Sequence, residues 1–393
     1  MRIRAILAVL VWIAGCADQD GPVATDRFLA GDRAAIPVAQ RQPGPARRPV
    51  ELAPAGVWQV RDAPRRYVAY QGIEAEIALA LGHGDGLVAI FDRPHLARLQ
   101  ERYYSQLPGV GFDLAPVMDL PFAEQVDLEL FLGLEADALL IDPRLPVAFW
   151  GWSPTDLGLV ARRVAPVVGN FIRYPRDQSW GPDYPQYDID GYAARLARLF
   201  DAQERWQGLA AFREATIARI QAALPPVDQR PRICVLNIGS DPAQGRFHLV
   251  ESHGGGARTR HFRDLGLVQA WDATQVQTGS YGACDYETLA AIDPPVLIVQ
   301  WAVSKCDGPE EFHRRFVQPL QEHPLGRRLQ AVRAGLVLPG GTGEQGPLTH
   351  LFQLEMLAQQ LFPTRFGSWT WSGPPDEPLF DRAALAAIIT GER

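Results

Sequence analysis

A long amphipathic helix between residues 201 and 224 constrains the fold of this chain more than any other stretch. The segment reads DAQERWQGLAAFREATIARIQAAL and runs into Pro225 and Pro226, which cannot continue a helix. Asp201 and Glu204 have the spacing of a capping box at its start. Apolar side chains then recur at helical spacing, at Trp206, Leu209, Ala210, Ile217, Ile220 and Leu224. At about 1.5 Å per residue, this helix spans roughly 34 Å, about the width of a small domain.

On both sides of this helix, stretches typical of strands alternate with stretches typical of helices. Such alternation predicts a mostly parallel sheet covered by helices. The segments that carry the pattern are RYVAY, GIEAEIALALG, GLVAIFD, VDLELFLGLEADALLIDP, SPTDLGLVARR and VAPVVGNF in the first half, and PRICVLNIG, FHLVES, TRHFRDLGL and CDYETLAAIDPPVLIVQW in the second. We therefore predict an α/β fold with two Rossmann-like lobes, residues 66–201 and 226–393. A single long helix, residues 202–225, joins them, and the ligand cleft lies between the lobes.

An internal repeat supports two related lobes. DLELFLGLEADALLI, residues 127–141, aligns without a gap with DYETLAAIDPPVLIV, residues 285–299. A helix-capping Asp with apolar positions after it could recur by chance. The matching place of the repeat in each half favours a duplication.

The N-terminus has the features of a secretory signal. Residues 1–15, MRIRAILAVLVWIAG, carry two arginines, an apolar run and then small residues. The segment ends at Cys16 in a sequence that resembles the bacterial lipobox, so we expect Cys16 to be lipidated, the alternative being an ordinary signal with a chance cysteine. Residues 16–65 are rich in Pro, Arg, Ala and Gly and are expected to be a flexible tether. The protein is then expected to contact the membrane only through this lipid anchor and to lie in the periplasm of the cell envelope.

Charge and cysteine content narrow the function classes. The net charge of −7 argues against general binding of nucleic acid. Nearly all positive charge is arginine, which suits forked recognition of anionic oxygens.

The cysteines after the signal are the next feature. Cys234 lies in the apolar run RICVLNI and is expected in the core. Cys284 and Cys306 flank one helix–strand unit, and an oxidising envelope would allow a disulfide between them, a pairing that the sequence leaves open.

Several of these segments together resemble a known family. They are YVAYQGIEAEIALALGHGDGLVAI, VDLELFLGLEADALLIDP, RDLGL, DYETLAAIDPPVLIV and GPLTHLFQLEMLAQQLFP. The chain from about residue 67 to 391 is similar to the periplasmic substrate-binding proteins of ABC importers for iron–siderophore complexes, cobalamin or haem. The resemblance implies two α/β lobes joined by one long helix, and an ABC permease with its ATPase as partners. It also implies that one glutamate on each lobe, here Glu129 and Glu287, docks on the permease. Both glutamates could instead be first-turn residues favoured by the helix dipole.

Ligand contacts are expected on loops at the carboxyl ends of the strands. Arginines there could meet anionic oxygens of a chelate, and aromatic faces could pack on its organic rim. The candidates are Tyr70, Arg93, Trp152, Arg173, Tyr174, Arg246, Arg258 and Trp301. The expected ligand is an iron(III) chelate of the siderophore type, and no resident metal or cofactor is predicted.

Alternative functions remain open on sequence grounds. A bare divalent metal would need converging ligands, for which His248, His253 and His261 are near one another in the chain. Haem could be held by a tyrosine, with Tyr70, Tyr103 and Tyr104 as candidates, and cobalamin is a further ligand of the family. A secreted enzyme is the least favoured alternative, because no G-x-S-x-G, P-loop or H-E-x-x-H motif is found. The runs SHGGGAR and PGGTGEQG are interpreted as turns.

Overall fold

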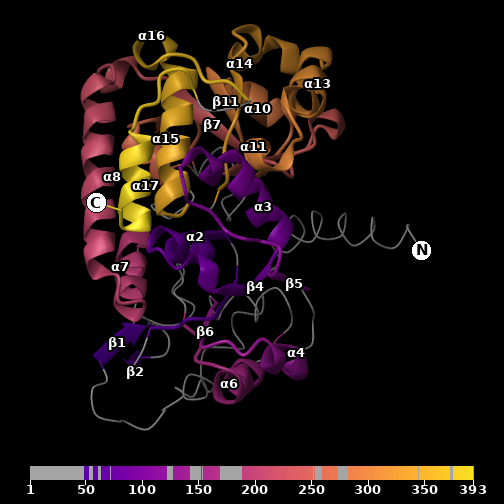
Figure 1. Ribbon diagram of the computed structural model, residues 1–393. Coiled ribbons are helices and arrows are strands. Elements are labelled where there is room, and N and C mark those ends of the chain that lie inside the picture. The colour runs from indigo at the N-terminus through magenta and orange to yellow at the C-terminus, as the bar shows by residue number, and fades with distance from the viewer. Residues whose placement is uncertain are drawn as a thin grey trace. The chain divides into compact units, whose positions relative to one another are not determined.

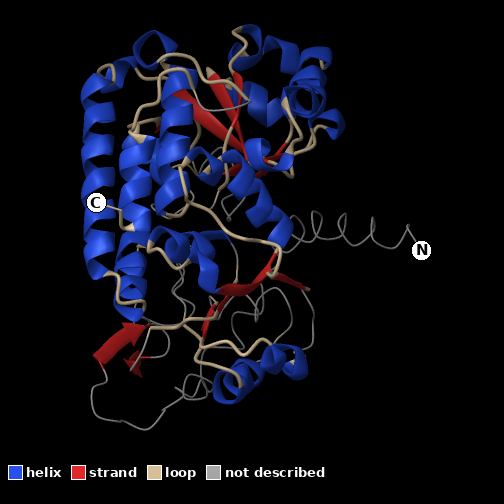
Figure 2. Cartoon of the chain, viewed as in Figure 1, coloured by secondary structure: helices blue, strands red, loops and turns tan. Residues whose placement is uncertain are grey.

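The computed structural model describes two compact units, each with its own β-sheet. The described residues are 48–52, 56–60, 63–70, 72–121, 127–141, 152, 154–168, 188–250, 252, 259–272, 282–343, 345–371 and 375–392. What we call the N-terminal unit comprises Arg27–Ile220, Glu344–Phe352 and Pro378–Arg393. The C-terminal unit comprises Gln221–Gly343 and Gln353–Glu377, together with Met1–Asp26, which lies outside the described residues. Figure 2 shows the helices that accompany both sheets.

The N-terminal unit is built on a parallel sheet with the strand order β5-β4-β3-β6. The apolar strand β3 lies at its centre, and its neighbours β4 and β6 are also mostly buried. The strands are β3 (Tyr67–Ala69), β4 (Leu87–Phe91), β5 (Met118–Leu120) and β6 (Ala138–Leu140), and the helices are α2 (Gly72–Ala80), α3 (Arg93–Arg102), α4 (Leu128–Gly133), α6 (Pro154–Arg163), α7 (Ile189–Leu199) and α17 (Arg382–Thr390). Of the strand expected after α6, the described part makes one parallel bridge, from Val167 to Leu139.

The C-terminal unit has a mixed sheet with the strand order β10-β8-β7-β11-β12, and β9 also pairs with β7. Strands β9, β7, β11 and β12 are parallel, whereas β8 is antiparallel to both β7 and β10. The strands are β7 (Arg232–Asn237), β8 (Phe247–Val250), β9 (Val268–Gln269), β10 (Gly282–Cys284), β11 (Val296–Gln300) and β12 (Val337–Pro339). The helices are α9 (Arg260–Asp264), α10 (Tyr286–Ile292), α11 (Ala302–Lys305), α12 (Pro309–Phe312), α13 (Gln318–Glu322), α14 (Gln330–Arg333) and α16 (Pro363–Phe366). The α/β fold class expected from the sequence is confirmed.

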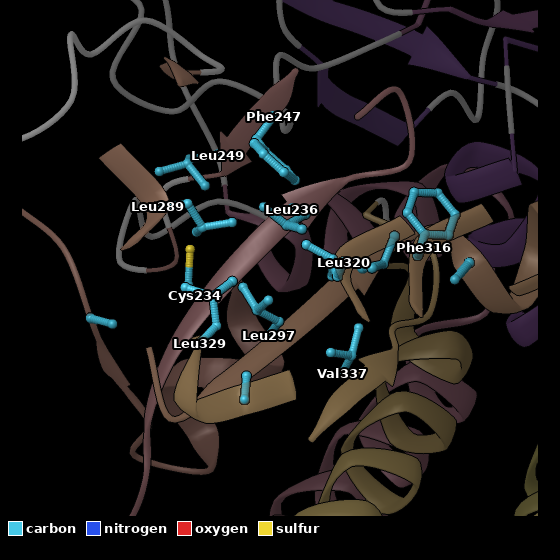
Figure 3. Packing of buried hydrophobic residues seen from close by; sticks show 14 of the residues in the cluster. Cys234, Leu236, Phe247, Leu249, Leu289, Leu297, Phe316, Leu320, Leu329 and Val337 are labelled. Atoms are coloured by element: carbon cyan, nitrogen blue, oxygen red, sulfur yellow. The ribbon is translucent and has the colours of Figure 1, made fainter. Parts of the chain in front are cut away.

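The core of the C-terminal unit packs between its sheet and its helices. Leu236, Leu249 and Leu297 project from three strands and are fully buried together with Phe316 and Leu320 (Figure 3). Burying a side chain of this size stabilises the fold by about 1.5–3 kcal/mol. Cys234 lies in the same cluster, as expected for a core thiol.

Helix α8, Gln203–Ala223, is the long helix expected from the sequence, and Figure 1 shows it as one unbroken element. Its buried face carries Trp206, Leu209, Arg213, Thr216 and Ile220, with alternating spacings of three and four residues. The predicted capping box is wrong. Helix α8 begins two residues after Asp201, so Ala202 rather than Asp201 directly precedes its first residue.

A second difference concerns the segment expected to be a tether. Residues Arg48–Leu52 (β1) and Gly56–Val60 (β2) form an antiparallel hairpin, and β1 contacts α7. The alternation in RPVEL and GVWQV, with a three-residue connection between them, is a hairpin signal that the high Pro and Arg content of the surrounding segment obscured. Within the described residues, no helix is long and apolar enough to cross a membrane.

The two copies of the internal repeat fold in the same way. In each copy an Asp caps a helix: Asp127 accepts a hydrogen bond from Leu130 N at 3.0 Å, and Asp285 from Thr288 N at 2.9 Å. Each helix leads into a strand, β6 or β11, that pairs in parallel with the first strand of its own sheet, β3 or β7. The shared construction of α4–β6 and α10–β11 supports the duplication favoured by the sequence.

Candidate functional site

The carboxyl ends of β7, β11 and β12 form one edge of the sheet in the C-terminal unit. From β7 the chain continues to β8, which lies on one side of β7, whereas β11 pairs with β7 on the other side. The boundary between β7 and β11 is therefore a topological switch point. In open α/β sheets, ligands bind beyond the strand ends at such a point. The residues there are Asn237 at the end of β7, Gln300 at the end of β11, and Trp301 immediately after it.

Trp301 is the sequence-predicted contact that lies at this edge. Its side chain is half-buried, and its backbone has φ 74° and ψ −3°, in the left-handed region. Trp301 N donates a hydrogen bond to Gly341 O at 2.7 Å, which ties the turn after β11 to the loop after β12. The indole is therefore presented from a turn that two parallel strands hold in place.

Arg246 lies on the neighbouring loop between β7 and β8. Asp241 and Arg246 exchange backbone hydrogen bonds of 2.7 and 3.0 Å, which close the loop around a short 3₁₀ turn, Pro242–Gln244. The Arg246 guanidinium lies 3.4 Å from an Asp241 carboxylate oxygen, and its side chain is 70% exposed. An ion pair this exposed is worth little, so an incoming anion could replace the carboxylate at small cost.

In the N-terminal unit, the two predicted aromatic contacts lie in the core. Tyr70 and Trp152 are each 4% exposed and belong to one hydrophobic cluster, in which Trp152 meets Phe131 edge to face at 5.9 Å. Tyr70 N also donates to Leu140 O at 2.9 Å, joining the ends of β3 and β6. Packing in the hydrophobic core is sufficient to explain an aromatic side chain at both positions, and a ligand contact at either one stays a prediction.

Arg93 is the first residue of α3 and is separated from the end of β4 by Asp92 alone. Its N–H donates to Asp119 Oδ1 at 3.0 Å, and the preceding Asp92 caps the helix through His95 N at 3.3 Å. The turn thus holds Arg93 at the carboxyl edge of the N-terminal sheet. Four other predicted residues, Arg173, Tyr174, Arg258 and Cys16, lie outside the described residues.

Glu129 and Glu287 occupy equivalent positions in the repeat. Each is exposed and lies in the first turn of an Asp-capped helix, α4 or α10. Next to Glu287, the buried Tyr286 hydroxyl donates to Pro242 O at 2.9 Å and so anchors α10 to the loop that carries Arg246. The helix dipole favours an acidic residue at both positions, which is compatible with either interpretation of these glutamates.

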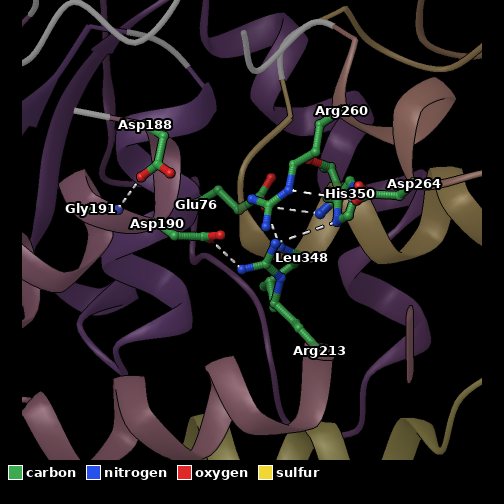
Figure 4. Close-up of polar contacts among 10 residues, drawn as sticks. Glu76, Asp188, Asp190, Gly191, Arg213, Arg260, Asp264, Leu348 and His350 are labelled. Carbon is green, nitrogen blue, oxygen red and sulfur yellow. Dashed lines mark hydrogen bonds and ion pairs between the residues drawn. The ribbon is translucent and has the colours of Figure 1, made fainter. Parts of the chain in front are cut away.

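A buried polar network in the N-terminal unit was missed by the sequence analysis. Glu76 on α2 is 1% exposed and accepts hydrogen bonds from Tyr104 Oη at 2.8 Å, Leu348 N at 2.6 Å and Thr349 N at 2.9 Å. The two amides belong to the first turn of α15, Pro347–Leu361, so the carboxylate takes the place of an N-cap (Figure 4). Burial raises the pKa of Glu76, although these hydrogen bonds act in the opposite direction. A glutamate inside the apolar run GIEAEIALALG was the signal available in the sequence.

Arg213 forms the second part of this network, from the buried face of α8. Its guanidinium donates to Asp190 Oδ1 at 2.6 Å and lies 3.4 Å from His350 Nδ1 (Figure 4). The arginine side chain is almost completely buried, whereas Asp190 is partly exposed. Arg213 thereby connects α7, α8 and the start of α15 within the N-terminal unit.

The tyrosines considered for haem are all buried. Tyr104 is fully buried and its hydroxyl is engaged by Glu76; Tyr103 is 4% exposed and packs on Phe352 at 5.4 Å. Burial raises the pKa of both phenols, which disfavours the tyrosinate that binds ferric iron. Among the described residues no group of three or more His, Cys, Asp and Glu could hold a metal ion; of the three histidines considered for a metal, His248 and His261 are described and His253 is not.

Cys234, Cys284 and Cys306 are free thiols in this structure. Burial is the main cause that raises the pKa of Cys284 to about 12, with a contribution from the charge of Asp285, and the pKa of Cys306 to about 11. Both thiols are therefore protonated at neutral pH and react slowly. The disulfide between Cys284 and Cys306 stays a prediction.

Comparisons with known proteins agree with the resemblance expected from the sequence. Residues 183–339 match the family described as periplasmic binding protein, whereas a search of curated proteins finds no match. A periplasmic binding protein from Veillonella parvula has a TM-score of 0.59 at 16% identity, covering 80% of this chain and 97% of its own. The petrobactin-binding protein YclQ from Bacillus subtilis has a TM-score of 0.55 at 14% identity, with coverages of 80% and 99%. The periplasmic heme binding protein HutB of Vibrio cholerae has a TM-score of 0.53 at 15% identity, with coverages of 76% and 99%. The predicted resemblance and the fold class are confirmed, and at these identities the solved structures inform on the fold alone.

Proposed function

With the fold of periplasmic binding proteins as the premise, we propose that this chain is the substrate-binding protein of an ABC import system. It captures an iron(III) chelate of the siderophore type and delivers it to a membrane permease. The proposal is supported mainly by the extent of the structural alignment. Two binding proteins of this fold align with this chain over 97% and 99% of their own lengths, so almost every part of such a protein has a counterpart here. Among the binding proteins of this fold, YclQ is described as binding petrobactin and another as a Fe³⁺-hydroxamate transport system.

Capture is assigned to the carboxyl edges of the two sheets. Trp301 and Arg246 supply an aromatic face and an exposed cation in the C-terminal unit. Arg93 supplies a second cation in the N-terminal unit. Guanidinium groups pair with anionic oxygens, and indole faces pack on organic rings, which are the two surfaces that a ferric chelate offers. The other candidates from the sequence are Tyr70, Trp152, Arg173, Tyr174 and Arg258.

Delivery is assigned to Glu129 and Glu287. Their equivalent, exposed positions on the two repeat helices suit opposite-charge docking on a permease, which steers and orients association more than it strengthens it. The ATPase of the system is the further implied partner. Residues 1–15 are proposed as a signal peptide and Cys16 as a lipid anchor in the periplasm, and no catalytic role is proposed.

A thermal-shift screen tests the proposal. The protein is a soluble form starting at Ala17, which keeps the β1–β2 hairpin, and the panel contains ferric catecholate, ferric hydroxamate, ferric citrate, haemin, cobalamin, zinc and manganese. A ligand present at 100 times its Kd stabilises the folded state by about 2.7 kcal/mol. We expect a ferric chelate to raise the melting temperature by roughly 5 °C. A rise with haemin, cobalamin or free metal alone would replace the iron–siderophore assignment, and no rise with any compound would contradict the binding function.

A further inference from the structure

The Tyr286 side chain lies between helix α10 and two other segments of the C-terminal unit. Its ring is 4% exposed and stacks on His323, which follows α13, with the ring centroids 3.5 Å apart and the planes inclined by 9°. The ring also meets Phe247, the first residue of β8, edge to face at 4.9 Å. One side chain of α10 thus contacts both the segment after α13 and the start of β8.

The Tyr286 hydroxyl reaches residues 241–246, which we call the β7–β8 loop. It donates a hydrogen bond to Pro242 O at 2.9 Å, and Gly245 N donates to the same carbonyl at 3.1 Å. The other carbonyl within reach, Pro319 O, is farther away at 3.4 Å, and a hydroxyl has one proton to donate. Burial is the main cause that raises the pKa of Tyr286 to about 12, so the hydroxyl remains a donor at neutral pH.

Two glycines let these segments approach the tyrosine ring. A Cβ added at Gly245, where φ is 66°, would lie 3.3 Å from Tyr286 Cδ2. A Cβ added at Gly326 would lie 3.0 Å from Tyr286 Cε1. Gly245 directly precedes Arg246, so the ring lies against the backbone beside the exposed arginine. The hydroxyl at Pro242 and the ring at Gly245 therefore hold the β7–β8 loop at two points.

The internal repeat shows that the cap of α10 does not itself require a tyrosine. Tyr286 follows the capping Asp285 and aligns with Leu128, which follows the capping Asp127. Leu128 is partly buried and packs on the hydrophobic cluster of the N-terminal unit. An apolar side chain is thus sufficient at this position for a capped and packed helix. Because a leucine side chain cannot donate a hydrogen bond, the link to a neighbouring loop belongs to the second copy.

This link connects a residue assigned to ligand capture with a residue assigned to docking. Arg246 ends the β7–β8 loop, and Glu287 follows Tyr286 in the first turn of α10. Segments of a protein that open as one cooperative unit share the same opening free energy. A ligand bound to any part of such a unit stabilises all of it by the same amount. A ligand on Arg246 would in this way stabilise the helix that carries Glu287.

We infer that Tyr286 is a positioning residue that makes the β7–β8 loop and the first turn of α10 one cooperative unit. The inference rests on the proposed function, which assigns ligand capture to Arg246 and permease docking to Glu287. It adds a regulatory step to that function. Occupancy of the loop changes the stability of the docking helix, so the permease meets a firmer α10 on a loaded protein than on an empty one.

The first measurement needs no ligand. Tyr286→Phe removes the hydroxyl and keeps the ring, and we expect hydrogen exchange of the Gly245 and Arg246 amides in the full chain to become about three- to tenfold faster, the effect of one neutral hydrogen bond. Tyr67→Phe is the matched control, because the Tyr67 side chain is also buried and its hydroxyl donates to His83 O at 3.0 Å in the N-terminal unit. Unchanged exchange in Tyr286→Phe, or an equal change in Tyr67→Phe, would overturn the inference.

The second measurement follows α10 while the loop binds a ligand. The probes are ferric citrate, ferric catecholate and ferric hydroxamate, each at about 100 times its Kd. In the unmodified chain, a bound chelate should slow exchange of the Arg246, Thr288 and Leu289 amides by the same factor, up to about 100-fold. In Tyr286→Phe, the chelate should still slow exchange at Arg246 but should slow it less than about threefold at Thr288 and Leu289.

Arg246→Gln shows whether the chelate uses the loop, and it should weaken binding by about fivefold, the value of one exposed charge pair. Three results would overturn the inference while the proposed function stands: unaltered affinity in Arg246→Gln, no slowing in α10 of the unmodified chain with a chelate bound, or equal slowing in α10 of Tyr286→Phe. If the unmodified chain binds no chelate of any kind, the proposed function fails, and the inference that rests on it fails too.

Discussion

Replacing Glu76 tests whether a buried carboxylate fixes the start of α15. Three donors point at this side chain: the N–H groups of Leu348 and Thr349 and the hydroxyl of Tyr104. Each buried donor that loses its acceptor costs about 1–3 kcal/mol. Glu76→Ala removes both acceptor oxygens and so breaks all three hydrogen bonds, but it also relieves the burial of a charge, so we expect a loss of about 3–5 kcal/mol in the free energy of unfolding. Glu76→Gln keeps one acceptor oxygen and should lose about 1–3 kcal/mol.

The assay for this prediction is hydrogen exchange of the Leu348 and Thr349 amides, which reports the free energy of opening at the site itself. Glu101→Gln, on the exposed surface of α3, is the matched control. Opening free energies in Glu76→Gln within about 0.5 kcal/mol of the unmodified chain would refute the capping role, since surface substitutions have effects of that size.

The pH dependence of the same exchange gives a second arm of the test. Burial raises the pKa of Glu76 above its ordinary value of 4.5, so the folded state holds this proton more tightly than the unfolded state does. Glu76 therefore makes its full contribution to the free energy of unfolding below pH 4.5, and this contribution is lost as the pH rises through the higher pKa of the folded state. Glu76→Gln should abolish this loss of stability with rising pH. A gain of stability with rising pH in the unmodified chain would contradict the burial argument.

Three further predictions concern the other elements. Asp285→Ala should lower the free energy of unfolding, measured in urea, by about 1 kcal/mol, because it removes the cap of α10. Hydrogen bonds from Thr288 lower the pKa of Asp285, so this contribution to stability should be present above the ordinary pKa of 3.8 and should vanish as the pH falls through the lower pKa of the folded state. If Asp285→Ala still destabilised the protein in strong acid, the capping argument would be contradicted. Arg213→Ala should lower the free energy of unfolding by about 3 kcal/mol, since it leaves Asp190 without its buried partner, whereas the exposed Arg198→Ala should have little effect; equal losses would refute the role of the network. Glu129→Lys with Glu287→Lys should abolish uptake of the labelled chelate without changing its affinity for the purified chain, and unchanged uptake would exclude the docking role.

The sequence was sufficient for the features that depend on local periodicity. The 3.6-residue period of α8 and the strand–helix alternation predicted the two α/β units, and the Asp at the start of each repeat predicted the caps of α4 and α10. These features depend on contacts within a few residues of one another, which the order of residues displays directly.

The features that the sequence did not reveal depend on distant contacts. Glu76 and Leu348 are 272 positions apart, and only the fold brings the carboxylate to the amide. Tyr70 and Trp152 follow the rule for strand ends, yet packing against Phe91 and Phe131 places both in the core. The glycine run after β12 was interpreted as a turn because its approach to Trp301 exists only once β11 and β12 pair.

Calorimetric titration of the purified chain with a ferric chelate tests the central claim most directly. The account predicts binding of one chelate per chain, with the iron-free chelator binding at least tenfold more weakly, because the anionic oxygens recognised by arginine are arranged around the metal only in the chelate. Absence of heat with every ferric chelate, or equal affinity for the chelator with and without iron, would contradict it.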